Sequence, residues 1–250
     1  MPIAPNLVTL DDPSAYFERL AEFEAAHWWS ASLWRVAGHW LDWRLRDRVR
    51  LQAIDVGCGA GLTLSRLEAR PEIAEALGVD PSPEALGYAR RRGHRVVEAS
   101  ALALPFEDES FDVATCLDVI QHLPPRGIPT AVVELARVLR PGGAAVVRTN
   151  AGRDGIDLVR LCATFGAAGF RVVRASRVNL MGSLAQEVRG RLRPSRHRAH
   201  PSGGGLPSTS RGGMSDRLMA VIGRAEAFAV GRLGWSLPFG HSAMLLAVRD

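Results

Sequence analysis

Short apolar runs and helix-like stretches alternate along residues 51–150, and this alternation limits the chain to few folds. The runs with the length and composition of buried strands are 51–57, 75–80, 95–100, 111–118 and 143–150. The helical patterns between them are 61–69, 82–92 and 129–140. Strict alternation of strands and helices indicates a parallel sheet with crossover helices. We therefore expect an α/β fold for this part of the chain.

The flanking sequence adds helices and two more strands. Residues 12–50 are predicted to be helical, since Asp12-Pro13 is a helix start signal and apolar residues recur at helical spacing after it. The later elements are a helix at 158–170, a strand at 170–178, a helix at 215–233 and a strand at 241–248. Residues 193–214 are rich in Gly, Pro, Ser and Arg, which predicts a mobile loop.

Five of the six tryptophans lie between Trp28 and Trp43. Such a group of indole rings on a short helical segment is expected to pack against an apolar surface. One interpretation is a helical layer packed on the core. The other is a lid over a ligand, with some rings facing it, and the candidate lid residues are then His27, Trp28 and Trp29.

Three glycines within five positions, Gly57, Gly59 and Gly61, follow the first strand. Such a turn lets the backbone approach a ligand closely. The pattern is GxGxG followed by leucine, so the GxGxxG fingerprint of dinucleotide binding is not met. Asp55 would repel a pyrophosphate, and Asp80 ends the second strand, where an acid can accept both hydroxyls of a ribose. The implied ligand is a nucleoside that carries positive charge.

Four blocks in this region resemble the class I S-adenosylmethionine-dependent methyltransferases in order and spacing: IDVGCGAGLTLSRL, LGVDPSPEAL, VEASALALPFEDESFDVATCLDVIQHL and ELARVLRPGG. The resemblance implies S-adenosyl-L-methionine as cofactor and a Rossmann-like, doubly wound, seven-stranded sheet whose last strand is antiparallel. The expected parts are an N-terminal helical lid (1–50), the cofactor-binding core (51–178), a C-terminal insertion (179–240) and the final strand (241–250). Fainter similarity at both ends is to a subgroup associated with glycan or secondary-metabolite biosynthesis.

The same resemblance implies the cofactor contacts. The three glycines pass under the methionine part, Asp55 helps to hold its amino group, and Asp80 holds the ribose. The family usually carries an acid for the adenine amino group at the end of the third strand, where this chain has Ser100. Ser100 or the backbone of Ala101 is then expected to bind adenine, and Leu117 completes the predicted contacts.

His122 is the candidate general base, because it follows the fourth strand at the carboxyl edge, where doubly wound sheets bind ligands. A hydroxyl acceptor needs such a base, whereas an amine or a carboxylate needs mainly alignment and exclusion of water. The alternative is a structural role for His122. Asp118 is expected to be a turn or cofactor-contact residue rather than a catalytic acid.

The number and distribution of the basic residues indicate which binding partners to consider. All 31 are arginine, the formal net charge is +5, and nine lie between Arg171 and Arg211 against one acid, Glu187. Such a stretch can attract nucleic acid, anionic lipid or a phosphorylated substrate, although GC-rich coding also favours arginine. We expect a small-molecule substrate and no nucleic acid. The alternatives are a nucleic-acid or protein methyltransferase and a non-catalytic binding subunit; no oligomeric state follows.

The three cysteines lie far apart, without CxxC and without histidine at metal-ligand spacing. This argues against a metal site and a disulfide framework, and it suits a reducing compartment. The first residues lack the pattern of a signal peptide, and no run approaches the roughly 20 apolar residues of a membrane span. We therefore expect a cytoplasmic protein.

Overall fold

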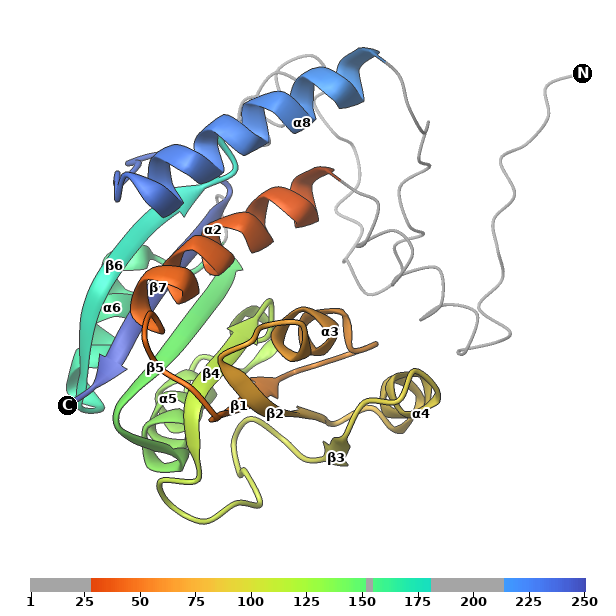
Figure 1. Ribbon diagram of the computed structural model, residues 1–250. Coiled ribbons are helices and arrows are strands. Elements are labelled where there is room, and N and C mark those ends of the chain that lie inside the picture. The colour runs from red at the N-terminus through yellow and green to blue at the C-terminus, as the bar shows by residue number, and fades with distance from the viewer. Residues whose placement is uncertain (1–27, 152–154, 181–213) are drawn as a thin grey trace, which may run out of the picture.

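The computed structural model describes residues 28–151, 155–180 and 214–250, and a seven-stranded sheet forms its centre (Figure 1). The strands are β1 (Leu51–Val56), β2 (Ile73–Asp80), β3 (Val96–Glu98), β4 (Phe111–Leu117), β5 (Leu139–Asn150), β6 (Phe170–Val178) and β7 (Ser242–Arg249). Their order is β3-β2-β1-β4-β5-β7-β6, and β7 runs antiparallel to both of its neighbours. The predicted sheet, with its antiparallel last strand, is confirmed.

Helices cover both faces of the sheet (Figure 1). One face carries α2 (Trp28–Arg44), α3 (Leu62–Glu68), α4 (Pro83–Arg91) and α8 (Met214–Ala227), and the other carries α5 (Gly127–Val138) and α6 (Leu158–Ala167). Two hydrophobic clusters result, one on each side of the sheet, and Trp40 and Phe165 are their largest fully buried side chains. Strands β4 and β7 are almost wholly buried, which explains why their sequences are mainly apolar.

The junction of α5 and β5 differs from the sequence-based expectation. The helix predicted at 129–140 ends at Val138, and the strand predicted to begin at 143 begins at Leu139. Leu139 pairs with Phe111, and the next pair is Val113 with Ala144, so Pro141-Gly142-Gly143 forms an irregularity inside the strand. Asp112 lies at this irregularity and accepts a hydrogen bond from Arg140 at 2.8 Å. The buried pairing of Leu139 thus extends the strand through residues that usually interrupt one.

The two helices α2 and α8 lie side by side and pack closely (Figure 1). A Cβ atom on Gly223 would lie 2.2 Å from Oγ of Ser32, and one on Gly231 would lie 2.6 Å from Nδ1 of His39. After α8 the chain continues as a π-helix, Phe228–Arg232, where the sequence predicted one helix over 215–233. Glycine is therefore needed at these two positions of α8 and the π-helix, where Ser32 and His39 of α2 approach closely.

Several predictions fall on residues that the structure does not describe. They are His27, residues 1–27 of the lid and residues 193–213 of the predicted loop, whereas Met214 begins α8. Within the described ranges, no helix is both long and apolar enough to cross a membrane.

Glu226 on α8 gives a prediction for stability. Its carboxylate accepts hydrogen bonds from the backbone N–H groups of Asn179 and Leu180. Burial raises its pKa despite these bonds, so the charged form is disfavoured in the folded state. The folded protein binds the proton more tightly than the unfolded chain, so Glu226 costs stability as pH rises from about 4.3 through the raised folded pKa.

Glu226→Gln is therefore expected to be more stable than wild type at neutral pH, because the amide oxygen can still accept both N–H groups. The gain in the free energy of unfolding, measured by urea denaturation between pH 4 and 7, should shrink as pH falls. The exposed Glu98→Gln is the control. A gain that does not depend on pH would contradict the argument.

Candidate active site

The glycine loop after β1 turns toward the carboxyl end of β2. The backbone N–H groups of Gly57 and Cys58 donate to the carbonyl of Val79 at 2.7 and 2.9 Å. Gly57 has φ +76°, and a Cβ atom there would lie 2.1 Å from Cγ2 of Val119. Glycine is thus required at this position both by conformation and by packing.

Gly59, at the centre of the loop, has open space beside its Cα atom, whereas Gly57 does not. No atom lies within 4 Å of the position that a Cβ atom would take at Gly59. The surface above the loop is therefore bare backbone next to open space, into which a side chain would project. A nucleoside cofactor with a methionine arm fits this surface, because its polar groups can approach the backbone there.

Asp80 is fixed at the carboxyl end of β2. One oxygen, Oδ2, accepts the backbone N–H of Gly59 at 3.0 Å, and Oδ1 accepts that of Ser82 at 2.9 Å. Ser82 in turn caps α4 by accepting the N–H of Ala85 at 3.2 Å. An ionised carboxylate can accept about four hydrogen bonds, so Asp80 keeps acceptor capacity for two hydroxyls.

Asp55 lies below the loop, and its side chain is buried. Its Oδ1 accepts a hydrogen bond from the Thr115 hydroxyl at 2.6 Å. Burial, with a contribution from the charge of Asp55, raises the pKa of Cys116 to about 12. Burial also raises the pKa of Cys58, with Asp55 and Asp80 adding to the shift. Both thiols therefore stay protonated at neutral pH and are not nucleophiles.

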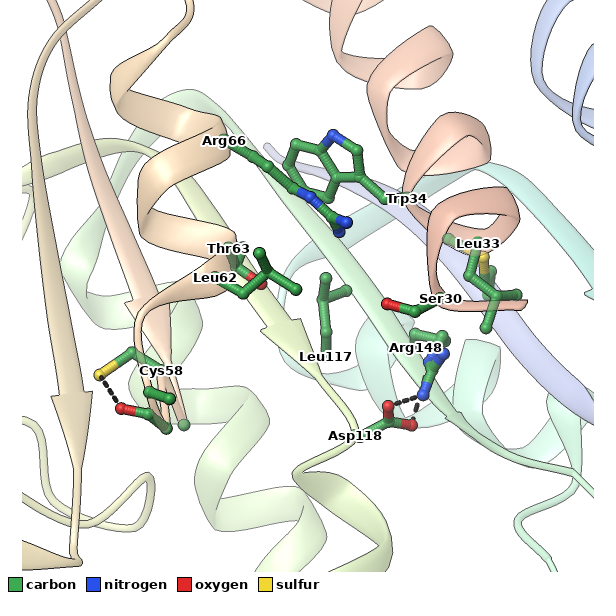
Figure 2. A pocket seen from close by; sticks show the side chains of 14 residues that line it. Ser30, Leu33, Trp34, Cys58, Leu62, Thr63, Arg66, Leu117, Asp118 and Arg148 are labelled. Atoms are coloured by element: carbon green, nitrogen blue, oxygen red, sulfur yellow. Dashed lines mark hydrogen bonds and ion pairs between the residues drawn. The ribbon is translucent and has the colours of Figure 1, made fainter. Parts of the chain in front are cut away.

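A cavity of about 120 Å³ lies between the first turns of α2, the glycine loop and the carboxyl ends of β4 and β5 (Figure 2). Leu117 and Met244 form part of its apolar wall. Two stacked pairs contribute charge at its rim: the Arg66 guanidinium lies 5.2 Å from the ring centroid of Trp34, and that of Arg148 lies 4.6 Å from the ring of Trp29.

Arg148 is the residue of this site that the sequence analysis missed. It is only 5% exposed, and its Nε donates to Oδ1 of Asp118 at 2.9 Å (Figure 2). The Asp118 N–H also donates to the Arg148 carbonyl at 2.9 Å, and Asp118 has φ +63°. The available signal was an arginine directly after the apolar run 144–147 of β5, because such a charge is rarely buried without a partner.

Only some of the predicted cofactor-binding residues line the cavity. Gly57, Gly59 and Leu117 do so, whereas Asp80 lies at the end of β2. Ala101 is buried beyond the end of β3.

Three other predicted residues are not part of the cavity lining. Ser100 is exposed, with its Oγ accepting the Leu102 N–H at 3.2 Å. His122 ends a short 3₁₀ helix, Ile120–His122, and is exposed outside the cavity lining. Gly61 is not part of the lining; a Cβ there would lie 2.4 Å from the His94 ring.

The tryptophans support parts of both interpretations. Trp40 is buried in the core and donates its indole N–H to the Val230 carbonyl at 3.3 Å. Trp34 lines the cavity, as a lid residue would. Trp28 and Trp29 line a second, smaller hollow between α2 and α8, which includes Glu226. Helix α2 therefore packs on the core with its C-terminal half, and its N-terminal half contributes Trp34 to the cavity.

The Arg148–Asp118 ion pair gives a second stability prediction. Asp118→Ala removes the carboxylate from a buried arginine, which is expected to lower the free energy of unfolding by about 1–3 kcal/mol. The matched control is Asp108→Ala, which removes a 74% exposed carboxylate from Arg137 and should change stability by less than about 1 kcal/mol. Urea denaturation measures both. Equal effects would show that burial of Arg148 adds nothing to the pair.

The sheet order, the glycine loop and the acid at the end of β2 define an α/β protein with a doubly wound sheet and a candidate ligand site at its carboxyl edge. Residues 54–147 match the family model of the methyltransferase domain. Within residues 54–147 the chain therefore resembles the class I S-adenosylmethionine-dependent methyltransferases.

Similarity to individual proteins agrees with this assignment. An uncharacterized methyltransferase of Mycobacterium sp. (strain JLS) is 34% identical over 139 residues, which are 54% of this chain and 50% of that protein. A ubiquinone biosynthesis O-methyltransferase of Methylococcus capsulatus is 35% identical over 107 residues, 39% of this chain and 43% of that protein. The chain spans about half the length of the curated relatives it matches.

A solved structure extends the similarity of fold to nearly the whole chain. It is a protein from Galdieria sulphuraria described as a sarcosine dimethylglycine methyltransferase, with a TM-score of 0.60 and 17% identity. The alignment covers 96% of this chain and 99% of that one. The described residues outside 54–147 are thus also similar in fold to that protein.

Proposed function

We propose that the protein transfers a methyl group from S-adenosyl-L-methionine to a small molecule, in secondary-metabolite or glycan biosynthesis. The observation that carries this proposal is the Asp80 carboxylate, fixed by the N–H groups of Gly59 and Ser82 beside an open glycine loop. The match of residues 54–147 to the methyltransferase domain supports it. When bound, the cofactor supplies a methyl group activated by a sulfonium.

The residues of the core have distinct roles in this proposal. Asp80 accepts the ribose hydroxyls, and Ser100 or the backbone of Ala101 binds adenine. Asp55, held by Thr115 below the loop, provides negative charge on the side of the cofactor amino group. None of these residues moves a proton; they bind and orient.

The acceptor would lie under α2, next to Leu117 and Trp34. The cavity of about 120 Å³ is smaller than the usual ligand pocket of about 300–1,000 Å³. A bound ligand therefore requires α2 to lie farther from the glycine loop, as a lid that opens and then closes would do. Closure under the apolar wall excludes water and aligns the acceptor with the methyl group.

The proposed acceptor atom is a hydroxyl oxygen, and His122 is the proposed base. Support for a hydroxyl comes from the name of the Methylococcus relative, an O-methyltransferase. His122 follows β4 at the carboxyl edge of the sheet but is not part of the cavity lining, so the acceptor hydroxyl would have to extend from Leu117 beyond the cavity to reach it. Its imidazole would take the hydroxyl proton as the methyl group moves.

The proposal is tested in two steps. Calorimetric titration with S-adenosyl-L-methionine measures cofactor binding, and mass spectrometry of candidate hydroxyl compounds with isotope-labelled cofactor measures transfer. Failure to bind the cofactor would overturn the proposal. Binding without transfer to any small molecule, together with salt-dependent binding of RNA, would favour a nucleic-acid methyltransferase instead.

A further inference from the structure

A third hollow lies at the β6 edge of the sheet and shares no lining residue with the cavity at the glycine loop or with the hollow between α2 and α8. Its volume is about 490 Å³, within the range of about 300–1,000 Å³ that ligand pockets occupy. The C-terminal half of α2, strand β6 and the segment after the π-helix bound it. We call it the edge groove, and its main lining residues are Trp43, Val173, Arg174, Leu233, Gly234 and Trp235.

The edge groove exposes two indole rings. Trp43 is 46% exposed and Trp235 is 60% exposed, which is unusual for side chains of this size. The Arg174 guanidinium lies over the Trp43 ring, 4.7 Å from its centroid. Stacking uses the flat face of a guanidinium and leaves the N–H donors at its edge available.

The groove is positively charged. None of its lining residues is acidic, and among the described residues Arg174 forms no ion pair. The two neighbouring arginines of β6 differ, since Arg171 lies 3.5 Å from Asp250 and Arg177 lies 3.7 Å from Asp157. Arg174 is therefore the arginine of this strand whose charge is available to a ligand anion.

Unusual backbone conformation builds one wall of the groove. The π-helix places the Leu233 N–H against the Phe228 carbonyl at 3.1 Å, and Gly234 follows with φ +75°. A Cβ atom on Gly234 would lie 2.6 Å from Nη1 of Arg174, so glycine leaves room for the guanidinium. The Ser236 hydroxyl then ties the segment to β6. Short π-helices and strained backbone are frequent at functional sites.

We propose that the edge groove is a second ligand site that binds a planar aromatic carboxylate. The ring stacks on Trp235 in the offset manner that indoles favour, and the carboxylate accepts charge-assisted hydrogen bonds from Arg174. Trp43 holds the guanidinium in place by stacking on its flat face. This site is separate from the proposed methyl-transfer site and does not depend on it.

The test uses three probes on the full chain. They are 2-naphthoate, which has ring and charge, cyclohexanecarboxylate, which lacks the aromatic ring, and 2-naphthol, which lacks the carboxylate. Dissociation constants from calorimetry or ligand-observed NMR should show at least about tenfold tighter binding of 2-naphthoate than of either other probe. Arg174→Gln and Trp235→Ala should each weaken 2-naphthoate binding by about tenfold. Arg171→Gln, on the same strand, is the matched control and should change nothing.

Three outcomes would overturn the proposal. They are equal affinity for the three probes, unchanged 2-naphthoate binding in both variants, and displacement of 2-naphthoate by S-adenosylhomocysteine, which would place it at the glycine loop. The protein could also form a dimer in ultracentrifugation and fail to bind 2-naphthoate. If Trp235→Ala then abolishes the dimer, the groove is assigned to a second copy of the chain. Thermal melting of each variant verifies its fold, and Arg174→Gln keeps the test valid if Trp235→Ala melts early.

Discussion

His122→Ala is expected to turn over a hydroxyl acceptor about 10²–10⁴ times more slowly than the wild-type protein, because general bases contribute rate factors of this size. Cofactor affinity should be unchanged, since His122 lies outside the cavity lining at the glycine loop. The comparison needs single-turnover rates with saturating cofactor and a separate titration of cofactor binding. Arg126→Ala, an exposed residue in the turn after His122, is the control.

Near-wild-type turnover of the His122 variant would remove the base hypothesis. Transfer would then depend on positioning alone, and the acceptor would be an amine or a carboxylate, which need no base. A loss of turnover accompanied by weaker cofactor binding and lower stability would instead indicate a structural role for His122.

Asp80→Ala is expected to weaken cofactor binding by more than about tenfold. The substitution removes a charged acceptor for two ribose hydroxyls, and a hydrogen bond to a charged group contributes about 1.5–3 kcal/mol. It also releases the N–H groups of Gly59 and Ser82, so the loop loses its attachment to β2. Asp80→Asn should lose less, because the amide oxygen still accepts one of these groups.

Calorimetric titration with S-adenosyl-L-methionine measures the effect. Glu75→Ala, an exposed acid near the start of the same strand, is the matched control. Affinity that stays at the wild-type value in Asp80→Ala would mean that the cofactor does not lie along the end of β2. In that case the cofactor would bind at another place on the protein.

Most elements of the sheet could be predicted because they carry a strong local signal, whereas the antiparallel last strand was implied by the family resemblance. Strands β4 and β7 are buried on both faces and mainly apolar in sequence, and Ser82 with Pro83 marks the start of α4. The start of β5 could not be predicted, since Pro141-Gly142-Gly143 would interrupt a strand that pairing of Leu139 with Phe111 extends. Tertiary pairing outweighed local preference there.

The site was predictable where backbone conformation or chain order determined it. Gly57 and Asp80 belong to local patterns around a turn. Arg148 was missed because its partner, Asp118, is 30 residues away and only the sheet brings them together. The π-helix was missed because its i to i+5 hydrogen bonds leave no periodic mark in so short a segment.

The close contact of α2 with α8 and the π-helix limits how the proposed acceptor site can be re-engineered. The two helices are nearly 200 positions apart in the chain, yet Gly223 fits against Ser32 and Gly231 against His39. A side chain larger than glycine on either of these positions collides with the partner helix. Exchange of α2 alone for the helix of another methyltransferase would therefore misfit α8, and chimeric proteins should transfer both helices together.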